Sequence, residues 1–219
     1  NRALEINQSN PVVLNNHGNV LDDLGDSAAA LVSFGRAIAL NPAYAEAYCN
    51  RGAVHNRLQQ YAQAIKDYDR AIELNPDYAE AFCNRGNTYQ ELRQIELAYR
   101  DYDQAIALRS DNAQAYWNKA LALLLSGDFG QGWPLYEWRW KRKSFTSHKR
   151  NFTTPLWLGN HPIKNKTILL YAEQGLGDAI QFCRYVRLVA AQGAKVVLEV
   201  PSPLVSLLKN ITSRLKLLS

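Results

Sequence analysis

The apolar residues of the first 138 positions recur at two periods. Within each predicted helix they return every three or four positions, which is typical of an amphipathic helix. The pattern as a whole repeats every 34 residues, and this period is typical of helix-turn-helix repeats. Four segments share the frame, beginning at Pro11, Ala45, Ala79 and Ala113. Each is predicted to form two antiparallel helices.

The sizes of residues within this frame indicate how the helices pack. Position 8 is small and position 24 is aromatic in every segment. These residues are Gly18, Gly52, Gly86 and Ala120 at position 8, and Phe34, Tyr68, Tyr102 and Tyr136 at position 24. A small residue lets two helices approach closely, and a ring fills the space between them. Asn41-Pro42 and Asn75-Pro76 are predicted to end second helices, since the residue before proline avoids the helical region.

This pattern resembles that of tetratricopeptide repeats. The resemblance implies a mainly α fold in which helix pairs stack into a solenoid, since each pair leaves an apolar face bare. Complete repeats are predicted at residues 11–44, 45–78 and 79–112. Residues 1–10 are interpreted as the tail of a preceding helix, with a further repeat upstream. Residues 113–138 are interpreted as a degenerate repeat or capping helices, because Gly132 stands where alanine is usual at position 20.

Asparagine occupies position 6 of every first helix. These residues are Asn16, Asn50, Asn84 and Asn118, and position 9 adds Asn19 and Asn87. Both positions are predicted to face the concave surface, since positions 4, 7, 8 and 11 form the packed side. Stacked helices lie roughly 8 to 10 Å apart, and an extended chain covers about 3.3 Å per residue. One carboxamide would therefore meet an extended peptide at about every third residue.

Three interpretations of this surface are open. A carboxamide both donates and accepts hydrogen bonds, so a row of them could bind an extended peptide or protein segment whatever its side chains. The row resembles the asparagine ladder in the repeats of O-linked N-acetylglucosamine transferase, which implies that use. Alternatively, the asparagines only join neighbouring helices. A clamp for chaperone C-termini needs Lys or Arg at positions 5 and 6, and Cys49 and Cys83 at position 5 argue against it.

Charge divides the chain near Arg139. Residues 1–138 hold 11 Lys and Arg against 17 Asp and Glu, whereas residues 139–219 hold 14 against 3. Residues 139–166 are therefore predicted to be a basic linker. Its segment 139–150 interleaves cations with Trp140 and Phe145, which suits a solvated linker or contact with a polyanion. No nucleic-acid-binding motif accompanies it, so nucleic acid is not an expected partner.

The hydrophobic period changes after residue 166. Residues 167–172 and 194–200 are short apolar runs that predict parallel strands, and residues 178–193 and 204–211 have helical spacing. This β-α-β-α order predicts the start of a partial α/β, Rossmann-like segment at residues 167–219. In such folds ligands bind where the first strand ends. That turn contains Gln174, Gly175, Gly177 and Asp178.

The turn is a poor dinucleotide fingerprint, because Ile180 replaces the third glycine. The runs GDFGQGWPLYEWRW, PLWLGN and KTILLYAEQGLGDAIQFCRYV resemble bacterial proteins in which tetratricopeptide repeats precede a heptosyltransferase-like glycosyltransferase domain. The resemblance implies that Asp178 is a catalytic base for an acceptor hydroxyl and that Gln174, Gly175 and Gly177 form an acceptor or sugar loop. It also implies a nucleotide-sugar donor in a longer parent, with no cofactor and no turnover in this fragment. A helix N-cap is the alternative role of Asp178.

Composition sets the remaining expectations. Three cysteines cannot build a disulfide framework, which suits a reducing compartment, and no apolar run predicts a membrane span. A cytoplasmic location and no metal site are expected. The favoured hypothesis is a protein-interaction module that serves an attached glycosyltransferase domain. A parent glycosyltransferase acting on protein or cell-envelope acceptors and a pure assembly scaffold are the alternatives, and self-association through exposed aromatic residues stays open.

Overall fold

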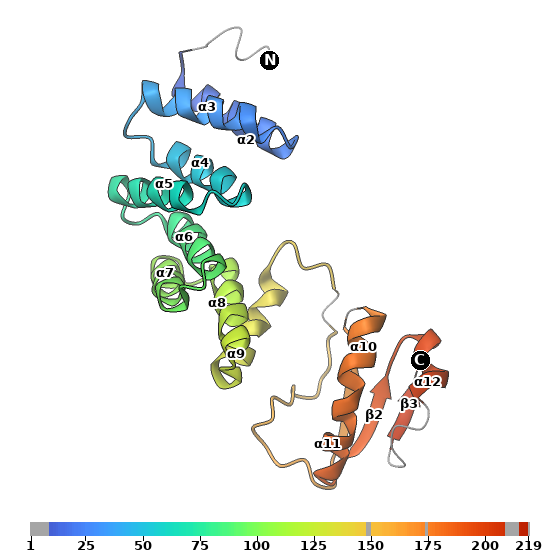
Figure 1. Cartoon of the computed structure of the whole chain (residues 1–219). Helices are drawn as coiled ribbons and strands as arrows, with labels where there is room; N and C mark the ends of the chain where they lie inside the picture. Colours follow the sequence, from blue (N-terminus) through green and yellow to red (C-terminus); the bar gives the residue numbers. More distant parts are fainter. Residues whose placement is uncertain (1–8, 148–149, 174, 209–214, 219) are drawn as a thin grey trace. The chain divides into compact units, whose positions relative to one another are not determined.

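The computed structural model describes residues 9–147, 150–173, 175–208 and 215–218. The chain forms two compact units, Asn1–Phe145 and Thr146–Ser219. Figure 1 shows helix pairs in the first unit and a sheet with helices in the second. The predicted mainly helical fold followed by a partial α/β segment is confirmed. The predicted helical tail at residues 1–10 lies almost entirely outside the described residues.

The first unit consists of helix pairs that follow the 34-residue frame. The pairs are α2 (Pro11–Asp23) with α3 (Ser27–Leu40), α4 (Ala45–Arg57) with α5 (Tyr61–Leu74), α6 (Ala79–Glu91) with α7 (Ile95–Leu108), and α8 (Ala113–Ser126) with α9 (Phe129–Tyr136). The side chain of Asn10 caps α2 by accepting from the backbone N–H of Val12 at 2.9 Å. As predicted, α3 and α5 end directly before Asn-Pro. None of the described helices is long and apolar enough to span a membrane.

A residue with positive φ joins the two helices of each pair. It is Gly25, Gln59, Arg93 or Gly127, with φ of 83°, 59°, 59° and 87°, respectively. The four turns therefore repeat with the same period as the helices. Gln59 and Arg93 carry a Cβ atom in this left-handed region, which costs roughly 1 kcal/mol or more per residue.

In the first three helix pairs, the ring at position 24 packs on the glycine at position 8, as predicted. Tyr68 and Tyr102 are buried. A Cβ atom on Gly52 would lie 2.8 Å from Cε1 of Tyr68, and one on Gly86 would lie 2.8 Å from Cε1 of Tyr102. Glycine is therefore required for the two helices of these pairs to lie this close.

Side chains that lie 16 positions apart form a second periodic feature. Arg51 donates to the two carboxylate oxygens of Asp67 at 2.8 and 2.6 Å. Arg85 donates to both oxygens of Asp101 at 2.7 Å, and its Nη1 atom donates to Asp69 of the preceding repeat at 2.6 Å. Asp67 and Asp101 are buried, so each depends on its arginine partner.

The last helix pair is covered by an aromatic 3₁₀ helix, η1 (Glu137–Lys141). The ring of Trp138 stacks on Tyr116 of α8, with centroids 3.8 Å apart and 6° between the planes. Arg139 is buried, and its guanidinium lies 4.6 Å from the ring centroid of Trp140. The first residues of the predicted basic linker thus belong to the helical unit, because their cations pack on aromatic faces.

The second unit is a parallel sheet with helices between its strands. Its elements are β1 (Thr167–Tyr171), α10 (Leu176–Phe182), η2 (Cys183–Tyr185), α11 (Val186–Ala191), β2 (Lys195–Glu199), η3 (Ser202–Leu204), α12 (Val205–Leu208) and β3 (Leu215–Leu218). The described strands pair in the order β1-β2-β3, with Thr167 opposite Lys195 and Val196 opposite Leu215. The predicted β-α-β-α order is observed, and β3 extends it beyond the prediction.

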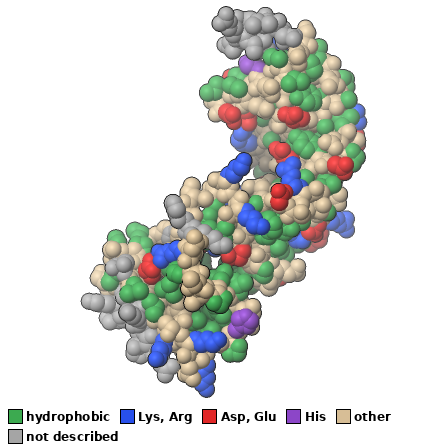
Figure 2. Space-filling model, turned by 180° about the vertical axis from the view of Figure 1, so that it is seen from behind, with side chains coloured by type: hydrophobic (Ala, Val, Ile, Leu, Met, Phe, Trp, Pro, Cys, Tyr) green, Lys and Arg blue, Asp and Glu red, His purple; other side chains and the backbone are tan. Residues whose placement is uncertain are grey.

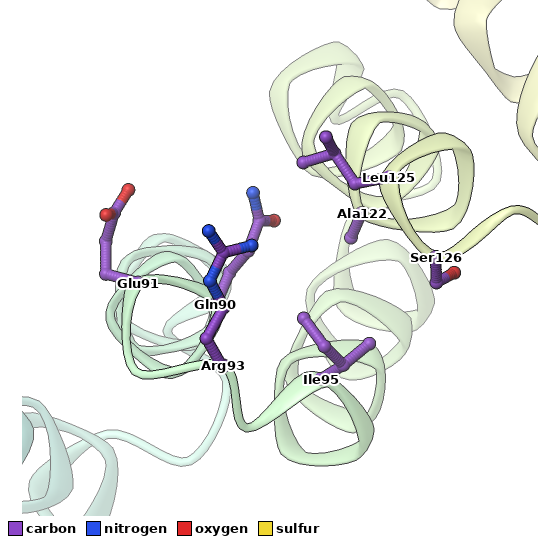
Figure 3. Close-up of a pocket in the computed structure, with 7 residues that line it drawn as sticks. All are labelled: Gln90, Glu91, Arg93, Ile95, Ala122, Leu125 and Ser126. Carbon is purple, nitrogen blue, oxygen red and sulfur yellow. The ribbon is translucent and has the colours of Figure 1, made fainter.

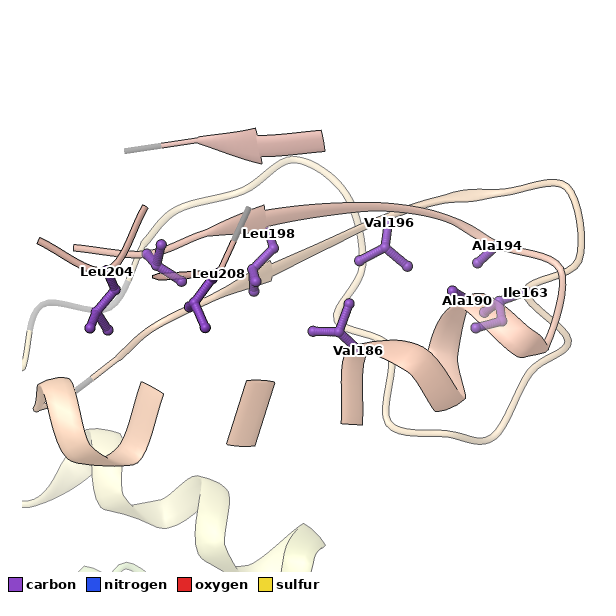
Figure 4. Close-up of a cluster of buried hydrophobic side chains, with 9 residues drawn as sticks. Ile163, Val186, Ala190, Ala194, Val196, Leu198, Leu204 and Leu208 are labelled. Carbon is purple, nitrogen blue, oxygen red and sulfur yellow. The ribbon is translucent and has the colours of Figure 1, made fainter. Parts of the chain in front are cut away.

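The core of this unit lies between β2 and the helices on one face of the sheet. Figure 4 shows the side chains of Val196 and Leu198 of β2 on the face of the sheet where Val186 of α11 lies. Ile163 joins this core, so the end of the predicted linker is folded as well. β1 is only partly buried, because Leu169 alternates to the opposite face and is 37% exposed.

Candidate functional site

The first helix of each pair forms the inner wall of the repeats. α2, α4, α6 and α8 contact one another in succession, and each second helix packs on its own first helix and on the next one. Positions 2, 6, 9 and 13 form one stripe along these first helices, since they are three or four residues apart. The glycines at position 8, on another side of the helix, are buried against the second helices. The stripe therefore faces away from the second helices and is called the concave surface.

The asparagines at position 6 are here called the ladder, and three of them, Asn50, Asn84 and Asn118, are bonded to the preceding repeat. The Nδ2 atoms of Asn50, Asn84 and Asn118 lie 3.0, 3.7 and 3.5 Å from Oδ1 of Asn15, Sγ of Cys49 and Sγ of Cys83, respectively. The acceptor is in each case the position 5 side chain of the preceding first helix. One amide hydrogen of each asparagine therefore joins neighbouring repeats.

The rungs of the ladder differ in how much of the carboxamide stays accessible. Asn16 is exposed, and Asn50 and Asn84 are half-buried. Among the described residues, the carboxamide oxygens of Asn50 and Asn84 have no hydrogen-bond partner. Asn118 is only 8% exposed, and its oxygen accepts from Nε2 of Gln114 at 2.7 Å. The accessible rungs are therefore the first three.

The asparagines at position 9 also differ from one another. Oδ1 of Asn87 accepts from the hydroxyl of Tyr102 at 2.9 Å and from Nδ2 of Asn118 at 2.6 Å. Asn87 thus links the third repeat to the fourth. Asn19 is half-buried, and no described residue makes a hydrogen bond with its side chain. Its carboxamide remains available to a ligand.

Two further sets of residues lie on this surface and were not among the predicted binding residues. The position 5 side chains, such as Asn15, hold the ladder in place. At position 2, Glu46 and Glu80 are exposed, and Oε1 of Glu46 accepts from Nδ2 of Asn15 at 3.1 Å. Both sets recur with the 34-residue period, which is the signal that could have revealed them. A segment bound to the ladder would lie beside these carboxylates.

The two cysteines that accept hydrogen bonds from the ladder are protonated at neutral pH. Burial, followed by the charge of Glu80, raises the pKa of Cys49 to about 12. Burial likewise raises the pKa of Cys83 to about 11. Because the thiolate is the reactive form of cysteine, these residues act as buried packing groups and not as nucleophiles.

A hollow of about 240 Å³ lies beside the concave surface, between the end of α6 and helices α7 and α8. Figure 3 shows Ile95 and Leu125 on its apolar side and Glu91 and Arg93 on the side of α6. Leu125 is 71% exposed and stands at position 13 of its repeat, as does Glu91. The hollow therefore offers apolar contact at the edge of a mostly polar surface.

The turn after β1 holds the remaining predicted site residues. α10 begins at Leu176 instead of Asp178, with Gly175 as its N-cap, so Asp178 lies in the first turn and not at the cap. Gly175, Gly177 and Asp178 are exposed, and Gln174 lies outside the described residues. The predicted helix is interrupted by the 3₁₀ turn η2. In the described part of the chain, no group of three His, Cys, Asp or Glu side chains could hold a metal ion.

Comparison with known families agrees with the repeat frame. Residues 45–78 and 79–112 each match the family model of the tetratricopeptide repeat. Residues 18–59 match a second model, described as a TPR repeat. No curated protein matches the chain.

Solved structures resemble the chain over the greater part of their own length. The crystal structure of MamA is 25% identical, covers 63% of this chain and 80% of its own, and has a TM-score of 0.56. The first TPR of Spaghetti (RPAP3), bound to the HSP90 peptide SRMEEVD, is 25% identical. The match covers 53% of this chain and 93% of that one, with a TM-score of 0.51. YrrB, a TPR protein with an unusual peptide-binding site, is 21% identical. The match covers 63% of this chain and 71% of that one, with a TM-score of 0.53, and shows the fold alone. The helix pairs of the first unit therefore form a solenoid of tetratricopeptide repeats.

Proposed function

We propose that the repeats bind an extended segment of a partner protein on the concave surface. The observation that carries the proposal is the bonding of Asn50 and Asn84. Each uses one amide hydrogen to contact the preceding repeat and retains its carbonyl oxygen and a second amide hydrogen for a ligand. Similarity to a repeat domain solved with a bound peptide supports the proposal.

The ladder would recognise the backbone of the bound segment. Each free carboxamide oxygen accepts a peptide N–H, and the remaining amide hydrogen donates to a peptide carbonyl. The bond to the preceding repeat holds the side chain in one orientation, so less conformational entropy is lost on binding. Glu46 and Glu80 flank the ladder, and positions 5 and 6 carry no cation. An acidic segment such as the peptide bound to RPAP3 is therefore not the expected ligand of this surface.

The test uses peptides selected from a displayed library of random 12-residue sequences. Their affinities are measured by fluorescence anisotropy for the unchanged chain and for the Asn50→Ala/Asn84→Ala double variant. Two lost hydrogen bonds should weaken binding by about 5- to 100-fold. The Gln104→Ala variant, changed at an exposed position of α7, should bind as the unchanged chain does.

Methylation of the peptide backbone gives an independent check. An N-methyl group removes a backbone N–H without changing any side chain, so it should weaken binding at the positions that meet the ladder. Failure to select any peptide, or equal affinities for the double variant and the unchanged chain, would contradict the proposal.

A second proposal concerns the C-terminal unit, which we infer to be part of a glycosyltransferase-like domain of a longer protein. The parallel order β1-β2-β3 and the exposed Asp178, in the first turn of the helix that follows β1, support it. The matching family models cover the repeats and not this unit. In the longer protein, Asp178→Asn should abolish sugar transfer, measured by mass spectrometry of the acceptor, while circular dichroism stays unchanged. Undiminished transfer would exclude Asp178 as the base.

A further inference from the structure

The periodic ion pairs of the repeats have a gap at Arg51. The cation at position 7 of a repeat pairs with an aspartate. That aspartate lies either 16 residues later, in the same repeat, or 16 residues earlier, in the preceding repeat, and Arg85 has both partners. The backward pairs are Asp69 with Arg85 at 2.6 Å and Asp103 with Lys119 at 2.5 Å. The backward partner of Arg51 would be residue 35, which is glycine.

The guanidinium of Arg51 is consequently held along one edge only. Its Nε and Nη2 atoms donate to Asp67, and no described residue accepts a hydrogen bond from its Nη1 atom. The Nη1 atom of Arg85, by contrast, donates to Asp69. A Cβ atom built on Gly35 would have no heavy atom within 4 Å. Open space therefore lies where the next repeat has a carboxylate.

A hollow of about 650 Å³ is lined by Arg51 and by residues of α5. The ring of Tyr48 lies 5.5 Å from the guanidinium carbon of Arg51 and supports it. Every carboxylate that lines the hollow already has an arginine partner. The pairs are Asp67 with Arg51, Asp69 with Arg85 and Glu73 with Arg70.

The charged side chains of this hollow that keep a hydrogen-bond donor without a described partner are both cations, Arg51 and Lys66. Lys66 lines it, and among the described residues Lys66 has no acidic partner. Figure 2 shows acidic and basic side chains interspersed on one face of the repeats. The spare donors of Arg51 and Lys66 therefore lie in one hollow.

We propose that Arg51, Lys66 and the open place that the 16-residue spacing assigns to Gly35, here called the outer site, bind the carboxylate of an Asp or Glu side chain of a partner polypeptide. The chain itself shows which chemistry fits, because the equivalent positions of the second and third repeats, Asp69 and Asp103, supply a carboxylate to the cation of the following repeat. Charge-assisted hydrogen bonds to a guanidinium are among the stronger polar contacts in proteins. Position 7 lies away from position 6 around the first helix, so the outer site is independent of the ladder.

Substitution of Gly35 tests the outer site without touching Arg51. In the Gly35→Asp variant, the chain's own carboxylate should occupy the site, as Asp69 does in the next repeat. Gly35→Asn is the matched control, since it adds the same volume without the charge. The probe is a fluorescein-labelled 12-residue peptide of alternating Glu and Ser, compared with one of alternating Gln and Ser.

The Glu peptide should bind the unchanged chain and Gly35→Asn with similar affinity, and Gly35→Asp at least about 10-fold more weakly in fluorescence anisotropy. Binding should weaken as salt is added, and the Gln peptide should bind more weakly than the Glu peptide. Equal affinity of the Glu peptide for the two variants would overturn the proposal. A lower melting temperature for Gly35→Asp than for Gly35→Asn would also overturn it, because the place would then not accept a carboxylate.

The Asn50→Ala/Asn84→Ala variant separates the outer site from the concave surface. It should bind the Glu peptide as the unchanged chain does. If that variant loses the Glu peptide, the acidic ligand lies on the concave surface and the outer site is wrongly assigned, whereas the ladder proposal survives. If it retains the Glu peptide but also retains the selected peptides, the ladder proposal fails and the outer site stands.

Discussion

Gly52 and Tyr68 are packed so closely that a Cβ atom on Gly52 would lie 2.8 Å from Cε1 of the ring. Tyr68 is 1% exposed, so the ring has no free space into which it could move. We expect Gly52→Ala to lower the free energy of unfolding by about 1 to 3 kcal/mol, as overpacking of a core does. Urea denaturation followed by circular dichroism measures the change.

Gly35 supplies the control for this prediction. It lies in α3, and a Cβ atom added there would have no heavy atom within 4 Å. Gly35→Ala should therefore raise stability by up to about 1 kcal/mol through helix propensity alone. If both substitutions stabilise the chain equally, close packing at Gly52 is not the reason for glycine there.

The carboxylate of Asp101 is buried against Arg85, and the hydrogen bond between them is the main cause of the raised pKa of Arg85. Asp101→Asn removes the charge and leaves the arginine without its main partner. We expect a loss of about 3 kcal/mol of unfolding free energy, measured by urea denaturation. Asp103→Asn is the matched change at an exposed pair with Lys119 and should cost less than about 1 kcal/mol. Similar costs for the two variants would show that burial is not decisive.

Trp138 covers the end of the repeats by stacking on Tyr116, and the Nζ atom of Lys141 lies 3.7 Å from the centroid of the Trp138 ring. Trp138→Ala removes both interactions and should lower unfolding free energy by about 2 kcal/mol or more. Trp133→Ala, at a ring that is half-exposed, should cost less in the same thermal and urea experiments. A larger loss of unfolding free energy for Trp133→Ala than for Trp138→Ala would exclude η1 as the stabilising cap.

Cys49 and Cys83 should resist alkylation in the folded chain. Their pKa values are raised by burial to about 12 and about 11, so at pH 8 iodoacetamide should label Cys183 first, as followed by mass spectrometry. Unfolding in urea should expose all three. Because the folded state retains thiol protons that an unfolded chain releases above about pH 9, these groups should also make stability fall as pH rises from about 9 toward about 11. Fast labelling of Cys49 in the native state would contradict its burial.

The helix pairs could be predicted because the relevant contacts recur at fixed spacings. A glycine at position 8 and a ring at position 24 leave one close packing of two helices, and Asn41-Pro42 stops α3 for a local steric reason. The C-terminal unit was less predictable. The helix expected at residues 178–193 begins at Leu176 and is broken by η2. Its bounds were harder to predict because the segment is short and does not repeat, so its hydrophobic pattern occurs only once in the sequence.

By itself, the sequence determined the repeat frame, the helix pairs within it and the row of asparagines on one side of the first helices. Each of these follows from residue type and spacing along a single helix or a single pair. Only the tertiary structure decided which atoms of the row are free, since the donor of Asn84 is used at Cys49 of the preceding repeat and Asn118 is buried. It also decided that the Nη1 atom of Arg51 has no described acceptor, whereas that of Arg85 donates to Asp69. Such contacts join residues of different repeats, so they depend on how the helices stack, and spacing within one helix does not specify that.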